Sequence, residues 1–370
     1  MTTWLQRFLV IMVVLVLAPV EALAQNSNVR PPDNAVQNQT PEGEIPAHLM
    51  PSGSDSDFWR QIREGAAGQV SLPNAEAGLM IQSEGDNWRN LKEGNYAQYT
   101  AYGILGMIGL LAVFFVLRGR VRISHGRSDR TIVRFIGIER FAHWLTAVSF
   151  IILAITGLNL IFGRELIPLL DGLLGDSTGK AVYAQITMWG KIAHNSVGFA
   201  FMAGIILMFV MWVWHNIPNH HDLIWFARGG GILGGAHPPA KKFNGGQKII
   251  FWLTILGGGS LAASGIALIW PFQFEMFNGT FALVNSWAGT ELPTDLSPIQ
   301  EMQLMTLWHG IVAGVMIAVI LAHIYIGSMG MEGAFAAMGS GRVDRNWAKD
   351  HHSLWVDKVE KGQAAKTPAE

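Results

Sequence analysis

Five apolar segments, each close to or above the ~20 residues that cross a bilayer as a helix, follow residue 97 of this chain. They lie at about residues 98–117, 141–162, 192–214, 249–270 and 303–327. Composition agrees, because the 370-residue chain is 50% hydrophobic and only 14% charged, whereas soluble domains carry about 25% charged residues. The segments predict an all-α integral membrane protein with five transmembrane helices.

The N-terminus has the pattern of a secretory signal in residues 1–24. A basic residue precedes the apolar run from Phe8 to Leu17, and an A-x-A cleavage site ends at Ala24. A retained first membrane helix is the alternative, but the short apolar core favours cleavage. Residues 25–97 are rich in Pro, Asn, Gly, Ser and acids, and they predict an exported, partly disordered arm.

The basic residues of the loops predict the orientation in the membrane. Segment 118–140 has seven arginines and loop 215–248 has four basic residues, whereas loop 163–191 has three and loop 271–302 has none. Basic loops are cytoplasmic by the positive-inside rule. We therefore expect a bacterial inner membrane protein with a periplasmic N-terminal arm, a membrane domain at 118–330, and a cytoplasmic tail at 331–370.

The absence of cysteine restricts the cofactors that the chain can bind. It excludes disulfides, thiolate iron–sulfur ligation and CxxCH haem attachment. A metal cofactor must therefore use histidine, methionine or oxygen ligands, and the chain has 12 histidines. The balance of 26 basic and 27 acidic residues gives no indication of nucleic-acid binding, and no nucleophile–base arrangement indicates hydrolysis.

Two histidines of the last apolar segment, His309 and His323, are fourteen residues apart. At about 100° and 1.5 Å per residue, they return to within roughly 40° of one helix face and lie roughly 21 Å apart along it. Ionisable residues inside a membrane are costly and usually functional. Two haems at two depths, each with one ligand from this helix, would explain the spacing.

The predicted orientation gives each intramembrane histidine a depth. His194 matches His309 near the outer side, and His143 matches His323 near the inner side. A b-type haem needs two neutral imidazoles that face each other in a helix bundle. A single intramembrane histidine can equally be a hydrogen-bonded packing residue, but four at two matched depths favour two bis-histidine haem sites.

Two further features bear on these sites. His215 ends its helix at the inner side, so spacing leaves it open as the inner haem ligand, or as a contact to a haem propionate or a quinone. Small residues beside the ligands, Gly198, Gly310 and Gly314, would leave room for a macrocycle, although glycine is frequent in membrane helices.

Several motifs resemble one family, the cytochrome b (gamma) subunit of membrane-bound respiratory formate dehydrogenase. The resemblance covers roughly residues 134–358. It rests on RFIGIERFAHW, HNSVGF, WHNIPNHHDLIWF, KKFNGGQKIIFW, SGIALIWP, LWHG, LAHIYIG and GRVDRNWAKDHHSLW, in this order. It implies a four-helix transmembrane di-haem bundle with two b haems, to which segment 98–117 adds one extra N-terminal transmembrane helix. It also implies electron transfer to quinone from an iron–sulfur (beta) subunit, which is reduced by an exported molybdenum- or tungsten-containing catalytic (alpha) subunit.

The resemblance also implies roles for particular residues. It implies His194 and His309 as ligands of the outer haem, His143 and His323 as ligands of the inner haem, and a quinone site at Asn244 and Gly246 of the FNGGQK turn. From chemistry alone, that turn offers an amide and free backbone N–H groups to a quinone carbonyl, or it is an ordinary connection. No formate-oxidising site is expected in this chain.

Two other functions stay open at this point. Cytochrome b subunits of hydrogenases and related reductases share the four-helix arrangement, and only the electron donor would differ. A non-redox membrane anchor or transporter would use the histidines for packing or proton relay. The signal, the arm and helix 98–117 lie outside the resemblance, so their function stays undefined.

Overall fold

The computed structural model describes residues 95–231 and 237–364, which belong to one compact unit. Five helices in this part are long and apolar enough to cross a membrane. These are α7 (Ala97–Arg118), α8 (Gly137–Ile161), α10 (Asp176–Trp212), α12 (Gly245–Ile269) and α14 (Pro298–Tyr325). The prediction of an all-α membrane protein with five spans is confirmed. The predicted signal and nearly all of the predicted arm lie outside the described residues.

Shorter elements connect and follow the five long helices. They are β1 (Thr131–Val133), α9 (Gly163–Leu174), η4 (Val213–His215), α11 (His220–Ala227), η5 (Gly229–Gly231), α13 (Phe277–Ala288), the π-helical turn η6 (Ile326–Gly330), α15 (Ala336–Gly339), β2 (Arg342–Asp344) and α16 (Arg345–Ala364).

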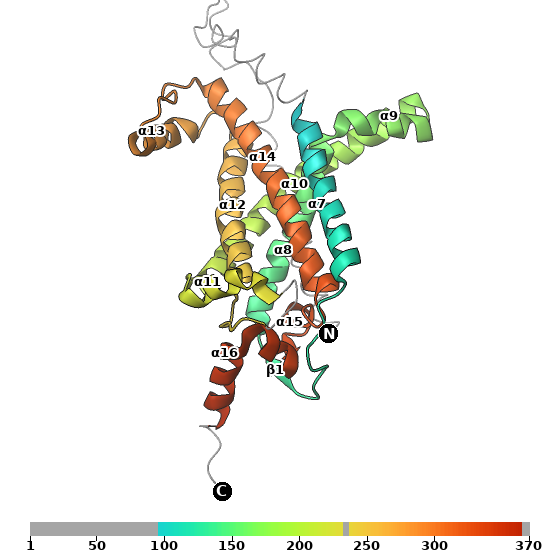
Figure 1. Ribbon diagram of the computed structural model, residues 1–370. Helices are drawn as coiled ribbons and strands as arrows, with labels where there is room; N and C mark the ends of the chain where they lie inside the picture. The colour runs from blue at the N-terminus through green and yellow to red at the C-terminus, as the bar shows by residue number, and fades with distance from the viewer. Residues whose placement is uncertain (1–94, 232–236, 365–370) are drawn as a thin grey trace, which may run out of the picture. The chain divides into compact units, whose positions relative to one another are not determined.

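The long helices pack in chain order, and the extra helix lies against the last one. Helix α8 packs along α10, α10 contacts α12, and α12 packs along α14. Helix α7 packs on α14, so α14 lies between α12 and α7 (Figure 1). The four helices α8, α10, α12 and α14 therefore form the bundle, and α7 is an addition to one side of it.

The connection at residues 163–191, expected as a loop, contains helices instead. Residues 163–191 form α9 and the first turns of α10, which are separated at Gly175, where φ is +90°. The stretch after Gly175 has no proline, so no missing backbone N–H interrupts the helix before the membrane segment. The hydroxyl of Tyr183 donates a hydrogen bond to the Asn159 carbonyl at 2.9 Å, which ties this extension of α10 to α8.

Capping residues fix where two of the bundle helices begin. Asn244 and Gln247 exchange side-chain-to-backbone hydrogen bonds at the start of α12, and Ser297 and Gln300 do the same at the start of α14. Such capping boxes satisfy backbone N–H groups that the first helical turn leaves free. Glu301 in the first turn of α14 also accepts hydrogen bonds from three backbone N–H groups at the start of α13.

An apolar cluster fills the middle of the bundle. Phe150 of α8, Phe201 and Ile205 of α10, and Met316 of α14 are its buried members. Side chains of α12 pack around it. Dispersion contacts of this kind hold membrane helices together, because lipid offers no hydrophobic gain for burying one apolar surface against another.

The C-terminal segment folds against the loop that follows α7. Strand β2 pairs antiparallel with β1, with Ile132 opposite Val343. Val343, Trp347 and Val356 are at most 3% exposed and belong to one apolar cluster with residues of α8, α10 and α12. The predicted tail is therefore packed onto one end of the bundle as far as the end of α16.

A buried ion pair fixes the connection between α10 and α12. The Nζ atom of Lys248 lies 2.7 Å from an oxygen of Asp222, and both side chains are largely buried. The same ammonium group donates to the Ile217 carbonyl at 2.9 Å. Because removing one member would leave an uncompensated buried charge, this pair holds α11 against the start of α12.

Candidate functional site

The structure brings the four intramembrane histidines together as two facing pairs. His194 of α10 faces His309 of α14 with ring centroids 6.2 Å apart, and His143 of α8 faces His323 of α14 with the same separation of 6.2 Å. We call them the outer pair and the inner pair, after the sides predicted from the loop charges. Helix α14 thus supplies one imidazole to each pair, and α8 and α10 supply the others.

The two separations suit two imidazoles on opposite sides of one metal ion. A metal–imidazole bond is about 2 Å long, so rings that share a metal have centroids roughly 6 Å apart. Among the described residues, no group of three or more His, Asp or Glu side chains could hold a metal by protein ligands alone. The arrangement therefore fits a metal whose remaining ligands come from a macrocycle, and the residues present fit haem.

Hydroxyl groups orient both imidazoles of the outer pair. Nδ1 of His194 lies 2.8 Å from Oγ1 of Thr156, and Nδ1 of His309 lies 2.8 Å from Oγ of Ser264. Each hydroxyl donates its own proton to the backbone carbonyl four residues earlier, at 2.8 Å for Thr156 and 2.9 Å for Ser264. The hydroxyl oxygen must then accept from Nδ1–H, so Nε2 of each ring carries the free lone pair that a metal needs.

Glycines that follow these hydroxyl residues make room for the rings. A Cβ on Gly157 would lie 3.5 Å from Cε1 of His194, and one on Gly265 would lie 3.4 Å from Cε1 of His309. Each of α8 and α12 therefore contributes a hydroxyl residue and a glycine in succession to the back of an imidazole. The Thr156-Gly157 and Ser264-Gly265 pairs are the trace of this arrangement in the sequence, and they point to a site only once the opposite imidazole is known.

The glycines singled out from the sequence have other neighbours. A Cβ on Gly310 would overlap the ring and hydroxyl of Tyr96, and one on Gly314 would lie 3.3 Å from the Thr100 side chain. These two glycines of α14 therefore face the start of α7. The expectation that they make room beside the ligands is wrong for Gly310 and Gly314, while Gly198 has no atom within 4 Å of such a Cβ.

The inner pair lacks the hydroxyl partners of the outer pair. Nδ1 of His143 is buried and makes no hydrogen bond within the described part of the chain. The ring of His143 is 5.4 Å from that of Trp144, whose Nε1 donates to the Met338 carbonyl at 3.0 Å. The two pairs therefore share one spacing but differ in the polarity around their rings.

His215 lies apart from both pairs. It belongs to the short turn η4 after α10, where its exposed ring is 6.4 Å from the ring of Phe243. The structure thus brings His323, and not His215, to face His143.

The FNGGQK turn has a structural role at the start of α12. The Asn244 oxygen accepts a hydrogen bond from the Gln247 backbone at 3.0 Å, so it caps the helix. A Cβ on Gly246 would lie 2.7 Å from the ring of Trp225, so the glycine permits close packing of α11. An open groove of about 290 Å³ begins beside this turn and is lined almost entirely by apolar side chains of α11 and α12, including Trp252 and Leu256.

Comparison with known proteins relates this site to a family. The model of the family described as prokaryotic cytochrome b561 matches residues 134–341, which is more than half of the chain and includes all four paired histidines.

Three relatives are cytochrome b556 subunits of formate dehydrogenase. That of the nitrate-inducible enzyme of Escherichia coli K12 is 29% identical over 246 residues, 66% of this chain and 98% of the relative. A second subunit from the same strain is 31% identical over 232 residues, 62% of this chain and 94% of the relative. The Haemophilus influenzae subunit is 26% identical over 232 residues, 62% of this chain and 83% of the relative. The chain is therefore a member of the prokaryotic cytochrome b561 family.

Proposed function

We propose that this chain is the di-haem membrane subunit of a formate dehydrogenase, which passes electrons from a periplasmic iron–sulfur subunit through two haems b to quinone at the cytoplasmic side. The observation that carries the proposal is the presence of two histidine pairs with the same 6.2 Å separation at two depths of α14. Membership of a cytochrome b family implies haem b, and two pairs imply two of them.

The four histidines would hold the haem irons. His194 and His309 would bind the outer one, and His143 and His323 the inner one. When bound, haem supplies one-electron redox chemistry. The chain contributes the spacing of the ligands, which is roughly 21 Å along α14 for fourteen residues. It also contributes the apolar cluster between the pairs, which includes Phe150 and Met316 and excludes water from the space between the two sites.

The partners follow from the chemistry that this chain lacks. It has no cysteine, so it cannot ligate an iron–sulfur cluster by thiolates. The relatives are named as subunits of formate dehydrogenase. We therefore place formate oxidation in a molybdenum- or tungsten-containing catalytic subunit, and the delivery of electrons to the outer pair in an iron–sulfur subunit.

The orientation is proposed from charge. The arginine-rich segment 118–140 and the basic loop 215–248 would lie in the cytoplasm of a bacterium, at the same end as the inner pair and α16. The N-terminal arm would then be periplasmic, where the electron donor binds.

Quinone would be reduced at the inner end of the bundle. Asn244 and Gly246 lie at the start of α12, and the apolar groove beside them suits an isoprenoid chain. The Asn244 oxygen is already used as a cap, so its amide nitrogen is the group left to donate to a quinone carbonyl. His215, exposed near the same end, is the second candidate for this contact.

Haem counts on histidine variants test the proposal. The purified wild-type chain should hold two b-type haems, and His309→Ala or His323→Ala should each hold one. His220→Ala, an exposed histidine in α11, is the matched control and should keep two. A colourless protein would indicate an anchor or transporter and contradict the proposal. Copurification with a nickel-containing hydrogenase, and not with a formate-oxidising subunit, would show that the electron donor is a hydrogenase.

A further inference from the structure

The inner end of the bundle must supply protons as well as electrons if quinone is reduced there. Reduction of a quinone to a quinol takes two electrons and two protons, and each carbonyl oxygen becomes a hydroxyl group. A general acid must lie within hydrogen-bond reach of the atom that it protonates. A proton donor is therefore required close both to the inner pair and to the turn at Asn244.

A carboxylate lies one helical turn from the inner pair. Glu139 precedes His143 by four residues in α8, and residues four apart share one face of a helix, with Cβ atoms about 5–6 Å apart. Glu139 is 9% exposed. It therefore lies on the face of α8 that carries the inner imidazole, one turn closer to the start of the helix.

Lys242 joins this carboxylate to the turn. Its Nζ atom donates a hydrogen bond to Oε1 of Glu139 at 2.7 Å, and it lies 5.0 Å from the ring centroid of Phe135. Lys242 is the second residue before Asn244. The buried guanidinium group of Arg134 donates to the Lys242 carbonyl at 2.7 Å, which holds the backbone of the turn. The ammonium group is thus bound to the helix of the inner pair and close in sequence to the turn.

The remaining contacts of Glu139 make Lys242 the proton donor of this ion pair. Oε1 of Glu139 also accepts from the indole N–H of Trp212 at 2.9 Å, and Oε2 accepts from the Ile136 backbone at 2.9 Å. Three donors match an ionised carboxylate, which only accepts hydrogen bonds. The ammonium group has three N–H bonds, and the ion pair uses one of them. The Lys242 side chain is 19% exposed, so water can return a proton to it.

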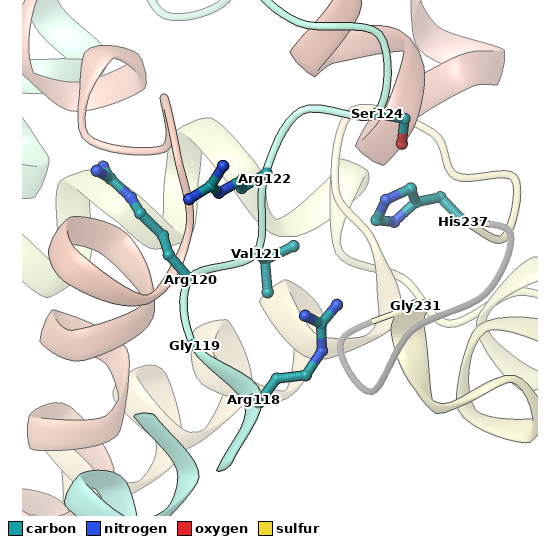
Figure 2. A pocket seen from close by; sticks show the side chains of 8 residues that line it. All are labelled: Arg118, Gly119, Arg120, Val121, Arg122, Ser124, Gly231 and His237. Atoms are coloured by element: carbon teal, nitrogen blue, oxygen red, sulfur yellow. The ribbon is translucent and has the colours of Figure 1, made fainter. Parts of the chain in front are cut away.

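The arginines that follow α7 are placed differently. Figure 2 shows a pocket of about 440 Å³, into which the guanidinium group of Arg118 points, whereas Arg120 and Arg122 lie on the other side of the segment. Its described lining comes from residues 118–124, Gly231 and His237, and not from the turn that carries Lys242. These arginines therefore take no part in the inference about the turn.

Other charged groups lie around the ion pair. The charges of Lys242, Glu139 and Lys358 act on the imidazole of His215, which is exposed just after α10. The charge of Glu139 also acts on the guanidinium group of Arg134. An imidazole ordinarily titrates near pH 6.5 and an ammonium group near pH 10.4, so measurements above pH 7.5 separate Lys242 from His215.

We propose that Lys242 donates a proton to a quinone carbonyl oxygen at the inner end of the bundle, and that Glu139 positions its ammonium group. This inference rests on the proposed reduction of quinone at that end. An N–H bond of the ammonium group breaks and its electron pair stays on nitrogen, while the O–H bond of the quinol forms. The two electrons arrive through the inner pair, one at a time. The second carbonyl oxygen takes its proton from solvent, and water recharges the amine. Until the transfer, the ammonium charge stabilises the negative charge that develops on the oxygen.

Reoxidation of the reduced protein by quinone tests the proposal. The purified full-length chain with both haems, reduced by a stoichiometric amount of dithionite, would be mixed with decylubiquinone, and the haem absorbance would be followed by stopped flow. Lys242→Arg keeps the positive charge, but a guanidinium group does not release its protons. We expect this variant to hold two haems and to be reoxidised roughly 100-fold more slowly. Lys241→Arg, the same change at the exposed neighbour, is the matched control and should keep the wild-type rate.

Glu139→Gln tests the positioning role. Glutamine still caps the start of α8, but it removes the negative charge beside Lys242. We expect reoxidation to slow roughly tenfold. Between pH 7.5 and 10, the fall of the rate with rising pH should begin at a lower pH than in wild type, because the ammonium group has lost the neighbouring charge that favours its protonated form. A merely structural role would lower the rate without moving this profile, and that result would overturn the positioning role.

The outcomes separate this inference from the proposed function. A wild-type rate in Lys242→Arg would overturn proton donation and leave quinone reduction in place. Equal slowing in Lys241→Arg would also overturn it, because the effect would then be general. If quinone does not reoxidise the wild-type protein, the proposed function fails and this inference fails with it. The double variant Glu139→Gln/Lys242→Met removes both charges together, so it leaves no buried charge unpaired and decides the question if Lys242→Arg loses a haem. It should keep two haems and be as slow as expected for Lys242→Arg.

Discussion

The hydroxyl oxygen of Thr156 accepts a hydrogen bond from Nδ1 of His194 at 2.8 Å, because its own proton is donated to the Ile152 carbonyl. Ser264 and His309 repeat this relationship on the opposite side of the outer pair. An imidazole whose Nδ1–H is hydrogen-bonded is a more basic ligand, and a basic ligand favours oxidised iron. If haem binds between each pair as proposed, the outer haem should have a lower potential than the inner haem, because Nδ1 of His143 has no such partner in the described structure.

Thr156→Val should raise the midpoint potential of the outer haem, because valine keeps the shape of threonine and removes the acceptor. The inner haem should keep its potential. Thr156→Ser keeps the hydroxyl and should leave the outer haem at its wild-type potential, whereas a packing defect would shift the potential in both variants. Potentiometric titration of the haem absorbance measures both. Equal shifts of both haems, or none, would refute the role of the hydroxyl.

His215→Gln should leave two haems bound, whereas His323→Gln should leave one, because only His323 faces His143. If His215 contacts quinone as proposed, its variant should slow quinone reduction while formate still reduces both haems. Haem content and the two rates, measured on one preparation, distinguish these roles. Loss of a haem in the His215 variant would reverse the assignment of the inner ligand.

Asp222→Ala should destabilise the protein by about 3–5 kcal/mol, because it leaves the ammonium group of Lys248 buried without its counter-charge. The Lys180–Asp171 pair is the control, since the Lys180 side chain is 66% exposed. Lys180→Gln should change the stability by less than about 1 kcal/mol. Thermal unfolding of the two variants in the same detergent compares them, and equal losses would contradict this account.

Stability should fall as the pH is lowered from about 6.5, because two histidines of α16 are buried as neutral rings. Burial, with the nearby His237 and Arg134, lowers the pKa of His351 to about 3, and burial also lowers the pKa of His352 well below its usual 6.5. The unfolded chain takes up protons below pH 6.5 and the folded chain does not, so acid favours unfolding. Each histidine contributes a slope of about 1.4 kcal/mol per pH unit.

Unfolding midpoints between pH 5 and 7.5 measure this slope. His351→Gln should reduce it, and His125→Gln should not, since His125 is exposed. An unchanged slope in the His351 variant would show that acid acts on the protein through other groups.

The spans and the histidine pairing were predictable because their signals are local. Apolar runs of sufficient length define the five helices, and the spacing of His309 and His323 on one helix sets the two depths. The helical connection α9 and the extension of α10 were missed, because their polar residues resemble those of loops. Thr156 and Ser264 were missed because a hydroxyl in an apolar helix has no distinctive pattern until the opposite imidazole is known. Gly310 and Gly314 were misassigned because α7, their actual neighbour, is distant in sequence.

Helix α14 carries one imidazole of each pair and contacts both α12 and α7. Each residue inserted or deleted between His309 and His323 would turn one imidazole about 100° away from its partner and shift it by about 1.5 Å. Substitutions at lipid-facing positions of this interval leave that geometry intact. This geometry therefore constrains the number of residues between the two histidines more strictly than the identity of the lipid-facing residues in the interval.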